Sequence, residues 1–155
     1  MSDEDNELQP SEAEQIESRL RLKRAREAAG KVPQDLGEFV GNTSSYYDLE
    51  NCDGELYMAA SLSELSRLCS ALGIKVRDLF DDRTNSEQTI SPEQLLFKVR
   101  EYLSQNGMSV AEFEGRIGFE IEPSLKDTSN VMDWNIDFLR WLCRELRLDW
   151  RLALP

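Results

Sequence analysis

The stretch that decides the fold runs from Thr43 to Glu50 and reads Thr-Ser-Ser-Tyr-Tyr-Asp-Leu-Glu. It follows Gly41-Asn42 and a short apolar segment, Asp35 to Val40. A glycine can end the first of two helices here, because it accepts the left-handed backbone at no steric cost. Tyr46 and Leu49 lie three residues apart and share the face that would pack on a core. The pattern predicts a helix, a tight turn and a second helix.

The outward side of this second helix is polar. Its residues are Thr43, Ser44, Ser45, Tyr47 and Asp48. Short polar side chains at the start of the second helix of such a pair suit contacts with base edges in a major groove.

The flanking sequence adds an ordered set of apolar, glycine and charged positions. They are Leu22, Ala25, Arg26, Gly30, Leu36 and Gly41, then Tyr46, Leu49 and Glu50, then Ser61, Leu62, Leu65, Leu68, Leu72, Gly73, Leu79 and Phe80. In this order of motifs, residues 19–80 resemble the phage-repressor-like (XRE) helix-turn-helix domain. The resemblance implies a five-helix unit in which Arg26 pairs with Glu50 and ties the first helix to the third.

The resemblance also implies double-stranded DNA as a partner, bound by Lys31, Gln34, Thr43, Ser44, Ser45 and Tyr47. The last four would enter the groove, and the first two would meet the backbone at the start of the second helix.

Sequence signals place the remaining helices of this unit. Apolar spacing predicts the first helix over residues 14–29 and the second from Pro33. Residues 51–60 predict a loop with a turn at Asp53-Gly54. Ser61 and Glu64 form a capping-box pattern that starts a fourth helix, and residues 74–80 predict a short fifth one.

Charge is distributed unevenly along the 155 residues, whose net charge is −12. Residues 1–15 carry six acids and no base, so residues 1–14 are expected to form an acidic disordered tail. Six bases gather in residues 19–31: Arg19, Arg21, Lys23, Arg24, Arg26 and Lys31. Such a row can contact phosphates, or it can face solvent beside its neighbouring acids, and the sequence leaves both alternatives open.

The second half of the chain repeats features of the first. Residues 81–89 have no large apolar residue and predict a linker, after which Ser91-Pro92 predicts a helix start. Gly107 and Gly118 reproduce the spacing of Gly30 and Gly41. The apolar pattern of residues 62–74 also recurs with the same spacing, at Ile136, Leu139, Leu142, Cys143, Leu146 and Leu148. We therefore expect an all-α protein of two tandem five-helix units, with a helix-turn-helix domain over 15–80 and a degenerate second helical repeat over 90–155.

The second copy lacks the features that make the first look functional. Glu120 and Glu122 would repel phosphate, Pro123 would break a helix that had run past its first turn, and Leu103 stands at the Arg26 position. The copy instead carries the three tryptophans, Trp134, Trp141 and Trp150. Their large apolar area predicts packing, either on the first half or on another chain.

Several function classes have no support. The chain has no histidine and no glycine-rich phosphate loop, and its three cysteines have no metal-ligand spacing, so we expect no enzyme, cofactor or metal. No apolar run reaches membrane-spanning length and no signal peptide opens the chain, so we expect a cytoplasmic protein.

The expected function is sequence-specific transcriptional regulation by DNA binding. The C-terminal half would supply a homodimer surface or a site for a protein partner. The alternative is a protein-interaction module on a helix-turn-helix scaffold, such as an antitoxin, an immunity protein or an anti-repressor. The acidic balance and the absence of Arg, Lys, Asn and Gln from the outward side of residues 43–50 support that alternative.

Overall fold

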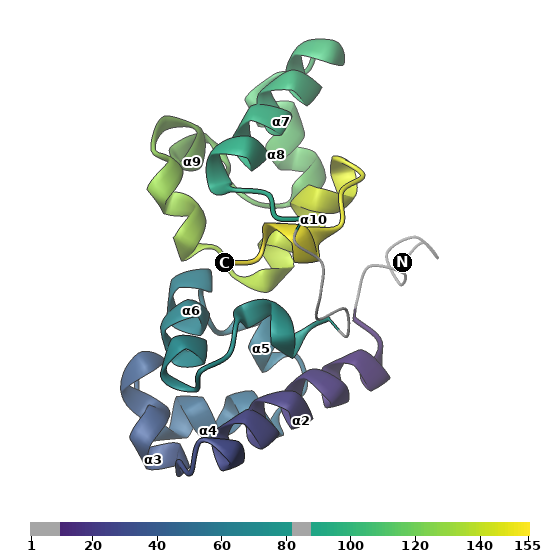
Figure 1. Cartoon of the computed structure of the whole chain (residues 1–155). Coiled ribbons are helices and arrows are strands. Elements are labelled where there is room, and N and C mark those ends of the chain that lie inside the picture. The colour runs from purple at the N-terminus through teal and green to yellow at the C-terminus, as the bar shows by residue number, and fades with distance from the viewer. Residues whose placement is uncertain (1–9, 82–87) are drawn as a thin grey trace.

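The computed structural model describes residues 10–81 and 88–155, called here the N-terminal and C-terminal halves. Both halves are helical, which confirms the all-α class (Figure 1). The predicted tail and linker lie largely outside these ranges, at residues 1–9 and 82–87. None of the described helices combines the length and apolar character that a membrane span needs.

The N-terminal half contains five α-helices and two 3₁₀ helices among its described residues. They are α2 (Glu12–Ala28), α3 (Pro33–Leu36), η1 (Gly37–Phe39), α4 (Thr43–Asn51), α5 (Glu55–Met58), α6 (Leu62–Ala71) and η2 (Val76–Leu79). Helix α2 begins two residues before the predicted start. Ser11 forms a capping box there, because its hydroxyl accepts from the Glu14 amide at 3.1 Å and its own amide donates to the Glu14 carboxylate at 3.1 Å.

Two predicted segments take a different form. The turn at Gly54 forms with φ of +83°, but the loop around it contains α5, which buries Leu56 and Tyr57. The fifth helix is shorter than the predicted 74–80 and is a 3₁₀ turn over Val76–Leu79. Both segments are short, so tertiary burial rather than helix propensity decides their form.

The C-terminal half begins at the predicted helix start. Its elements are α7 (Pro92–Gln105), α8 (Val110–Ile117), α9 (Glu122–Lys126), η3 (Thr128–Asp133), α10 (Ile136–Glu145) and η4 (Trp150–Ala153). Ser91 caps α7 with Gln94 as its reciprocal partner. Pro123 was predicted to break a helix that had run past its first turn, and no helix of the described residues carries it beyond that turn. Pro123 stands in the first turn of α9, where a missing N–H has no intrahelical acceptor to lose.

The two halves share a helix spacing. Helix α10 has the same length as α6, and η4 follows α10 at the same interval at which η2 follows α6. Helices α2 and α7 both end just before a glycine of positive φ, Gly30 and Gly107 respectively. Between these matching elements, the nine-residue α4 has no counterpart of equal length, because α9 has five residues and is followed by η3.

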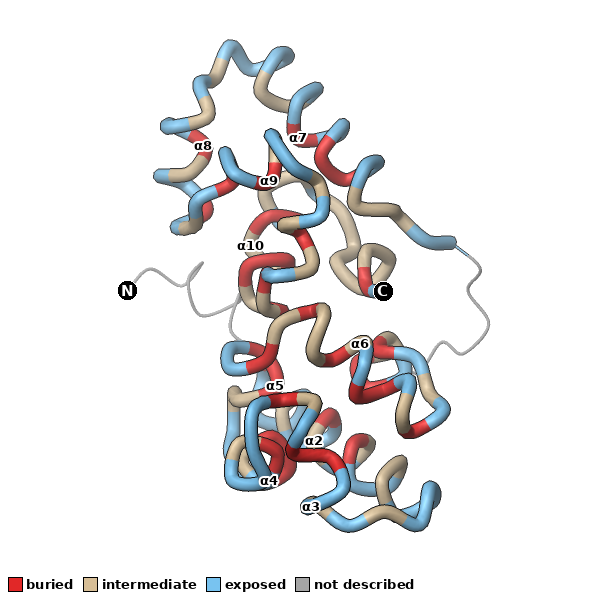
Figure 2. The backbone as a smooth tube through the Cα atoms, turned by 90° about the vertical axis from the view of Figure 1, so that its left-hand side faces the viewer, coloured by how far each residue is buried: buried red, intermediate tan, exposed pale blue. Residues whose placement is uncertain are grey.

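The C-terminal half packs directly on the N-terminal half. The Leu62 amide donates to the Trp134 carbonyl at 2.8 Å, and the Asn135 side-chain amide donates to the Met58 carbonyl at 3.1 Å. Helix α10 lies on α5 at this junction, and buried segments run along α10 and α6 (Figures 1 and 2). Of the two packing alternatives, the structure therefore has the tryptophan-bearing half on the first half.

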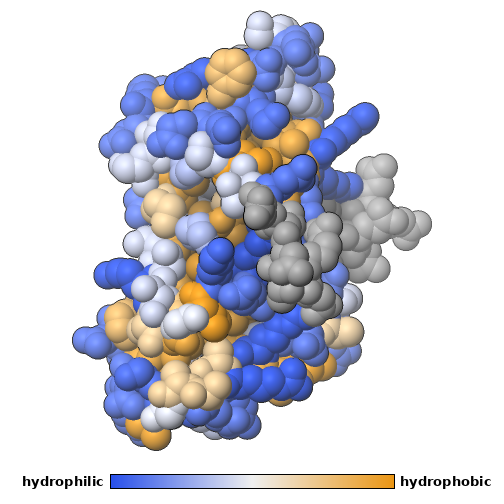
Figure 3. All heavy atoms as spheres, in the orientation of Figure 1, coloured by the Kyte–Doolittle hydropathy of each residue, from blue (hydrophilic) through white to orange (hydrophobic). Residues whose placement is uncertain are grey.

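Aromatic rings pack at and near this junction. The Trp134 ring stacks on Phe138 at 4.0 Å between centroids, and its indole N–H donates to the buried Ser124 hydroxyl at 3.0 Å. Rings from both halves meet edge to face, with Phe80 5.5 Å from Trp150. Such contacts add about 0.5–1.5 kcal/mol each beyond the apolar area they bury. On the face shown in Figure 3, hydrophobic residues are visible at the surface of both halves.

Candidate nucleic-acid interface

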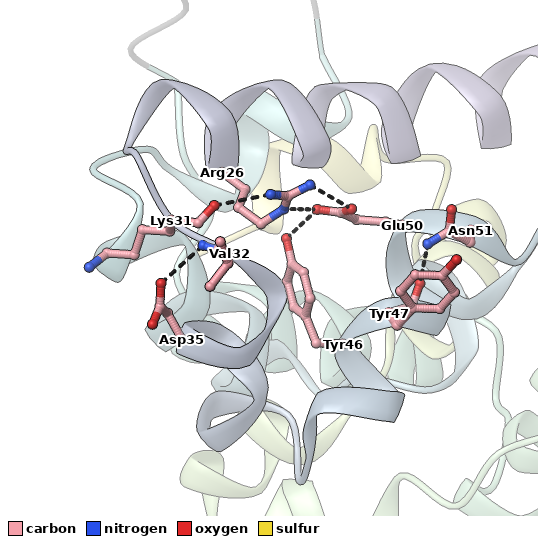
Figure 4. A network of polar contacts seen from close by, with 8 residues as sticks. All are labelled: Arg26, Lys31, Val32, Asp35, Tyr46, Tyr47, Glu50 and Asn51. Atoms are coloured by element: carbon pink, nitrogen blue, oxygen red, sulfur yellow. Dashed lines mark hydrogen bonds and ion pairs between the residues drawn. The ribbon is translucent and has the colours of Figure 1, made fainter.

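A buried ion pair fixes the orientation of α4 against α2. Arg26 of α2 donates from Nε to Glu50 Oε1 at 2.6 Å and from Nη2 to Oε2 at 3.2 Å. The Tyr46 hydroxyl donates to the same Oε1 at 2.7 Å, and Arg26 Nη1 donates to the Lys31 carbonyl at 3.0 Å (Figure 4). This Arg26–Glu50–Tyr46 clamp joins α2, α4 and the chain that leads into α3.

The electrostatics of the clamp favour its charged form. The Arg26 and Glu50 side chains are 12% and 4% exposed, so water screens their attraction weakly. The hydrogen bond to Glu50 raises the pKa of Arg26 above its usual value, against the opposing effect of burial. Burial, followed by the bond to Glu50, raises the pKa of Tyr46 far above its usual value. Tyr46 therefore stays neutral and remains a donor.

The turn between α3 and α4 depends on two glycines for different reasons. Gly41 has φ of +107°, a backbone conformation that glycine adopts without strain. Gly37 is helical, but a Cβ there would stand 2.5 Å from the Thr43 amide nitrogen. The close approach of η1 to the start of α4 thus leaves no room for a side chain. Asn42 caps α4 by accepting from the Ser45 amide at 2.8 Å.

The structure places the predicted DNA-binding residues on two sides of the clamp. Thr43 and Ser44 are exposed in the first turn of α4, and Ser45 is half-buried. Tyr47 is 57% exposed. Gln34 is exposed and Lys31 is half-buried near the start of α3. Figure 4 shows the Lys31 and Tyr47 side chains on opposite sides of the clamp, so these two do not converge.

All four arginines of the basic row have carboxylate partners, Arg26 through the clamp. Arg19 pairs with Asp53 at 2.6 Å, although the two lie far apart in the chain. Arg21 and Arg24 pair with Glu17 at 3.3 and 3.7 Å. The Arg24 side chain is nevertheless 67% exposed. The sequence did not predict the Arg19–Asp53 pair, because no pattern within the loop after Glu50 indicates that Asp53 would meet Arg19.

The three cysteines lie in two environments. Cys69 and Cys143 are buried on α6 and α10, and burial raises the pKa of each thiol to about 12. Cys52 is exposed at the end of α4, and its thiol donates to the Asp48 carboxylate at 3.7 Å. No group of three or more His, Cys, Asp or Glu residues in the described ranges is arranged to hold a metal ion.

Comparison with known proteins found no matching family model, no similar curated protein and no similar solved structure.

Proposed function

We propose that this chain is a sequence-specific DNA-binding regulator that reads DNA with α4. The observation that carries the proposal is the clamp: it presents the exposed first turn of α4 on a fixed support, with Tyr46, Leu49 and Glu50 buried behind it. A recognition helix must be held rigidly, because base contacts require side chains placed to within a fraction of an ångström.

The start of α4 has groups that could contact both a phosphate and a base edge. Its first turn holds no acid, so the positive end of the helix dipole is not neutralised by the helix itself. The Thr43 and Ser44 hydroxyls can donate to or accept from a base, and the Thr43 methyl group can contact a thymine methyl. Lys31, just before α3, would contribute a separate phosphate contact.

The proposed domain organisation is a helix-turn-helix unit over 15–80 and a degenerate second copy over 90–155. The interval from α6 to η2, which matches the interval from α10 to η4, supports it. The second copy has Leu103 at the position that corresponds to Arg26, so it cannot form the same ion pair there. It would act as a packing partner that supports the first copy, in the cytoplasm.

The proposal is tested by binding to duplex DNA containing the region upstream of the coding sequence. Ser44→Glu should weaken this binding at least tenfold, because a carboxylate in the first turn of α4 would face phosphate and leave a base edge unpaired. Ser104→Glu is the matched control, since Ser104 is an exposed helical serine on α7. Lys31→Gln should reduce the slope of log affinity against log salt by about 1. Equal affinities for the two glutamate variants would contradict a reading role for α4.

The second candidate is a protein-interaction module, and the internal pairing of the basic row favours it. Arginines that already contact Asp53, Glu17 and Glu50 have less to gain from phosphate. For this candidate, the folded protein would bind no duplex even at low salt. The exposed Tyr47 would then be a contact for a protein partner, because tyrosine is enriched at such interfaces.

A further inference from the structure

A cleft of about 460 Å³ opens where α2 meets the C-terminal half. Its volume lies within the usual range for small-molecule sites, about 300–1,000 Å³. Its charged and aromatic lining includes Glu14, Glu17 and Arg21 from α2, and Arg140, Trp150 and Arg151 from the C-terminal half. The lining includes no residue of α4, so a ligand here would not occupy the turn proposed to read DNA.

Two guanidinium groups flank one indole ring in this cleft. The Cζ atom of Arg140 lies 5.8 Å from the centre of the Trp150 ring, and that of Arg151 lies 5.3 Å from it. Arg140 also lies over the Tyr57 ring, at 5.5 Å. Arg151 lines the cleft and is oriented by its Nε, which donates to the Phe80 carbonyl at 3.0 Å, while its Nη1 lies 4.0 Å from Asp149 Oδ1. Both cations thus lie beside the same ring, where they would attract an anion.

Arg140 is largely withdrawn from solvent, and its carboxylate contact is long. Its side chain is 14% exposed, and its carboxylate partner Asp137 is 3.6 Å away, longer than an ordinary hydrogen bond. In the described part of the chain Arg140 makes no shorter polar contact. Loss of water lowers the pKa of this guanidinium, and the charges of Asp137 and Glu14 oppose that shift only in part. A guanidinium that has lost most of its water and has one long carboxylate contact is poorly stabilised. An incoming anion would supply part of the missing stabilisation.

The acids near these arginines offset them only in part. Glu14 raises the pKa of Arg140, and Asp149 Oδ1 lies 4.0 Å from Arg151 Nη1, longer than an ordinary hydrogen bond. Glu14 accepts from the Ser11 amide at 3.1 Å in the capping box of α2. Glu17 contacts Arg21 and Arg24 on its own helix. Both carboxylates therefore have partners on α2, on the opposite wall from Arg140. The aromatic rings provide the apolar surface of the cleft.

We propose that this cleft binds a small organic anion, whose carboxylate or phosphate lies between Arg140 and Arg151 and whose flat apolar part lies against Trp150. A guanidinium donates two parallel hydrogen bonds to either kind of oxyanion, so the two arginines select the charge. The surrounding rings would select a flat apolar body. Because the ligand would contact α2 and the C-terminal half together, it would stabilise the junction between them.

The test follows the Trp150 indole signal by nuclear magnetic resonance in the full-length protein, titrated with phenyl phosphate, benzoate, inorganic phosphate and phenol. Phenyl phosphate or benzoate should shift this signal saturably, with a Kd in the millimolar range or tighter for ligands of this size. The Trp141 signal serves as an internal reference. The two anions separate a phosphate ligand from a carboxylate ligand. Inorganic phosphate and phenol should bind at least tenfold more weakly, because each lacks one of the two recognised parts.

Arg140→Gln should raise the Kd of the tighter anion about tenfold or more, whereas Arg144→Gln, an exposed arginine at the end of α10, should leave it unchanged. If Arg140→Gln does not fold, Arg151→Gln makes the same test. No saturable shift with either organic anion would overturn the proposal. Equal binding by phenol or by inorganic phosphate, or by the folded arginine variants, would overturn it as well.

Discussion

Replacing Glu50 with Gln should destabilise the protein by about 3 kcal/mol, because three hydrogen bonds converge on that carboxylate. Two come from Arg26, at 2.6 and 3.2 Å, and one comes from the Tyr46 hydroxyl, at 2.7 Å. The neutral amide keeps the shape and some of these bonds, but it leaves the guanidinium of Arg26, 12% exposed, without its counter-charge. Breaking one side of a buried pair costs about 3–5 kcal/mol. Arg26 retains its bond to the Lys31 carbonyl, so we expect the lower end of that range.

The assay is urea unfolding of wild type, Glu50→Gln, Arg26→Gln and the double variant, followed by circular dichroism. The double variant should be more stable than the sum of the single effects predicts, with a coupling of about 1–3 kcal/mol, because it leaves no unpaired charge. Arg24→Gln is the control, since its pair with Glu17 is long and exposed and should contribute less than about 1 kcal/mol. Additive single effects, or a Glu50→Gln cost as small as the control's, would refute a role for the clamp in holding α4.

Two further predictions concern packing and thiol chemistry. Gly37→Ala should lower the free energy of unfolding by about 1–3 kcal/mol, because its Cβ would stand 2.5 Å from the Thr43 nitrogen. The control, Gly115→Ala in α8, has open space around it and should stabilise the protein by about 0.5–1 kcal/mol. Equal effects of the two substitutions in urea unfolding would contradict the close approach at Gly37. In the folded protein Ellman's reagent should react quickly with Cys52 alone, and a second fast thiol would contradict the burial of the other two. Because the buried thiols have pKa values raised to about 12, stability should also fall as pH rises above about 8.5, where only the unfolded chain releases those protons.

The sequence was most informative where a structural signal is local. Ser61 and Ser91 each cap a helix through a partner three residues away, so the pattern and the bond lie in the same short stretch. The buried pattern of Tyr46 and Leu49 was predictable for the same reason, since helical spacing alone assigns their face. Helix existence could therefore be predicted well, including the start of α7.

Interactions between distant segments could not be predicted in the same way. The pairing of Arg19 with Asp53 and the exclusion of a side chain at Gly37 depend on where two elements meet in space. Trp134 and Trp150 indicated packing but not a partner. A large apolar ring predicts burial, but the sequence does not identify the surface against which it is buried. The cleft at Arg140 was missed for this reason too, since its walls come from both halves of the chain.

The most direct test of the account is fluorescence anisotropy with the upstream duplex and a scrambled duplex, each repeated across a salt series. We expect tighter binding to the upstream duplex and an affinity that falls steeply with salt, because phosphate contacts release counterions. Equal affinity for both duplexes would contradict sequence reading by α4. Failure of the folded protein to bind either duplex at low salt would contradict DNA binding altogether and favour the protein-interaction module.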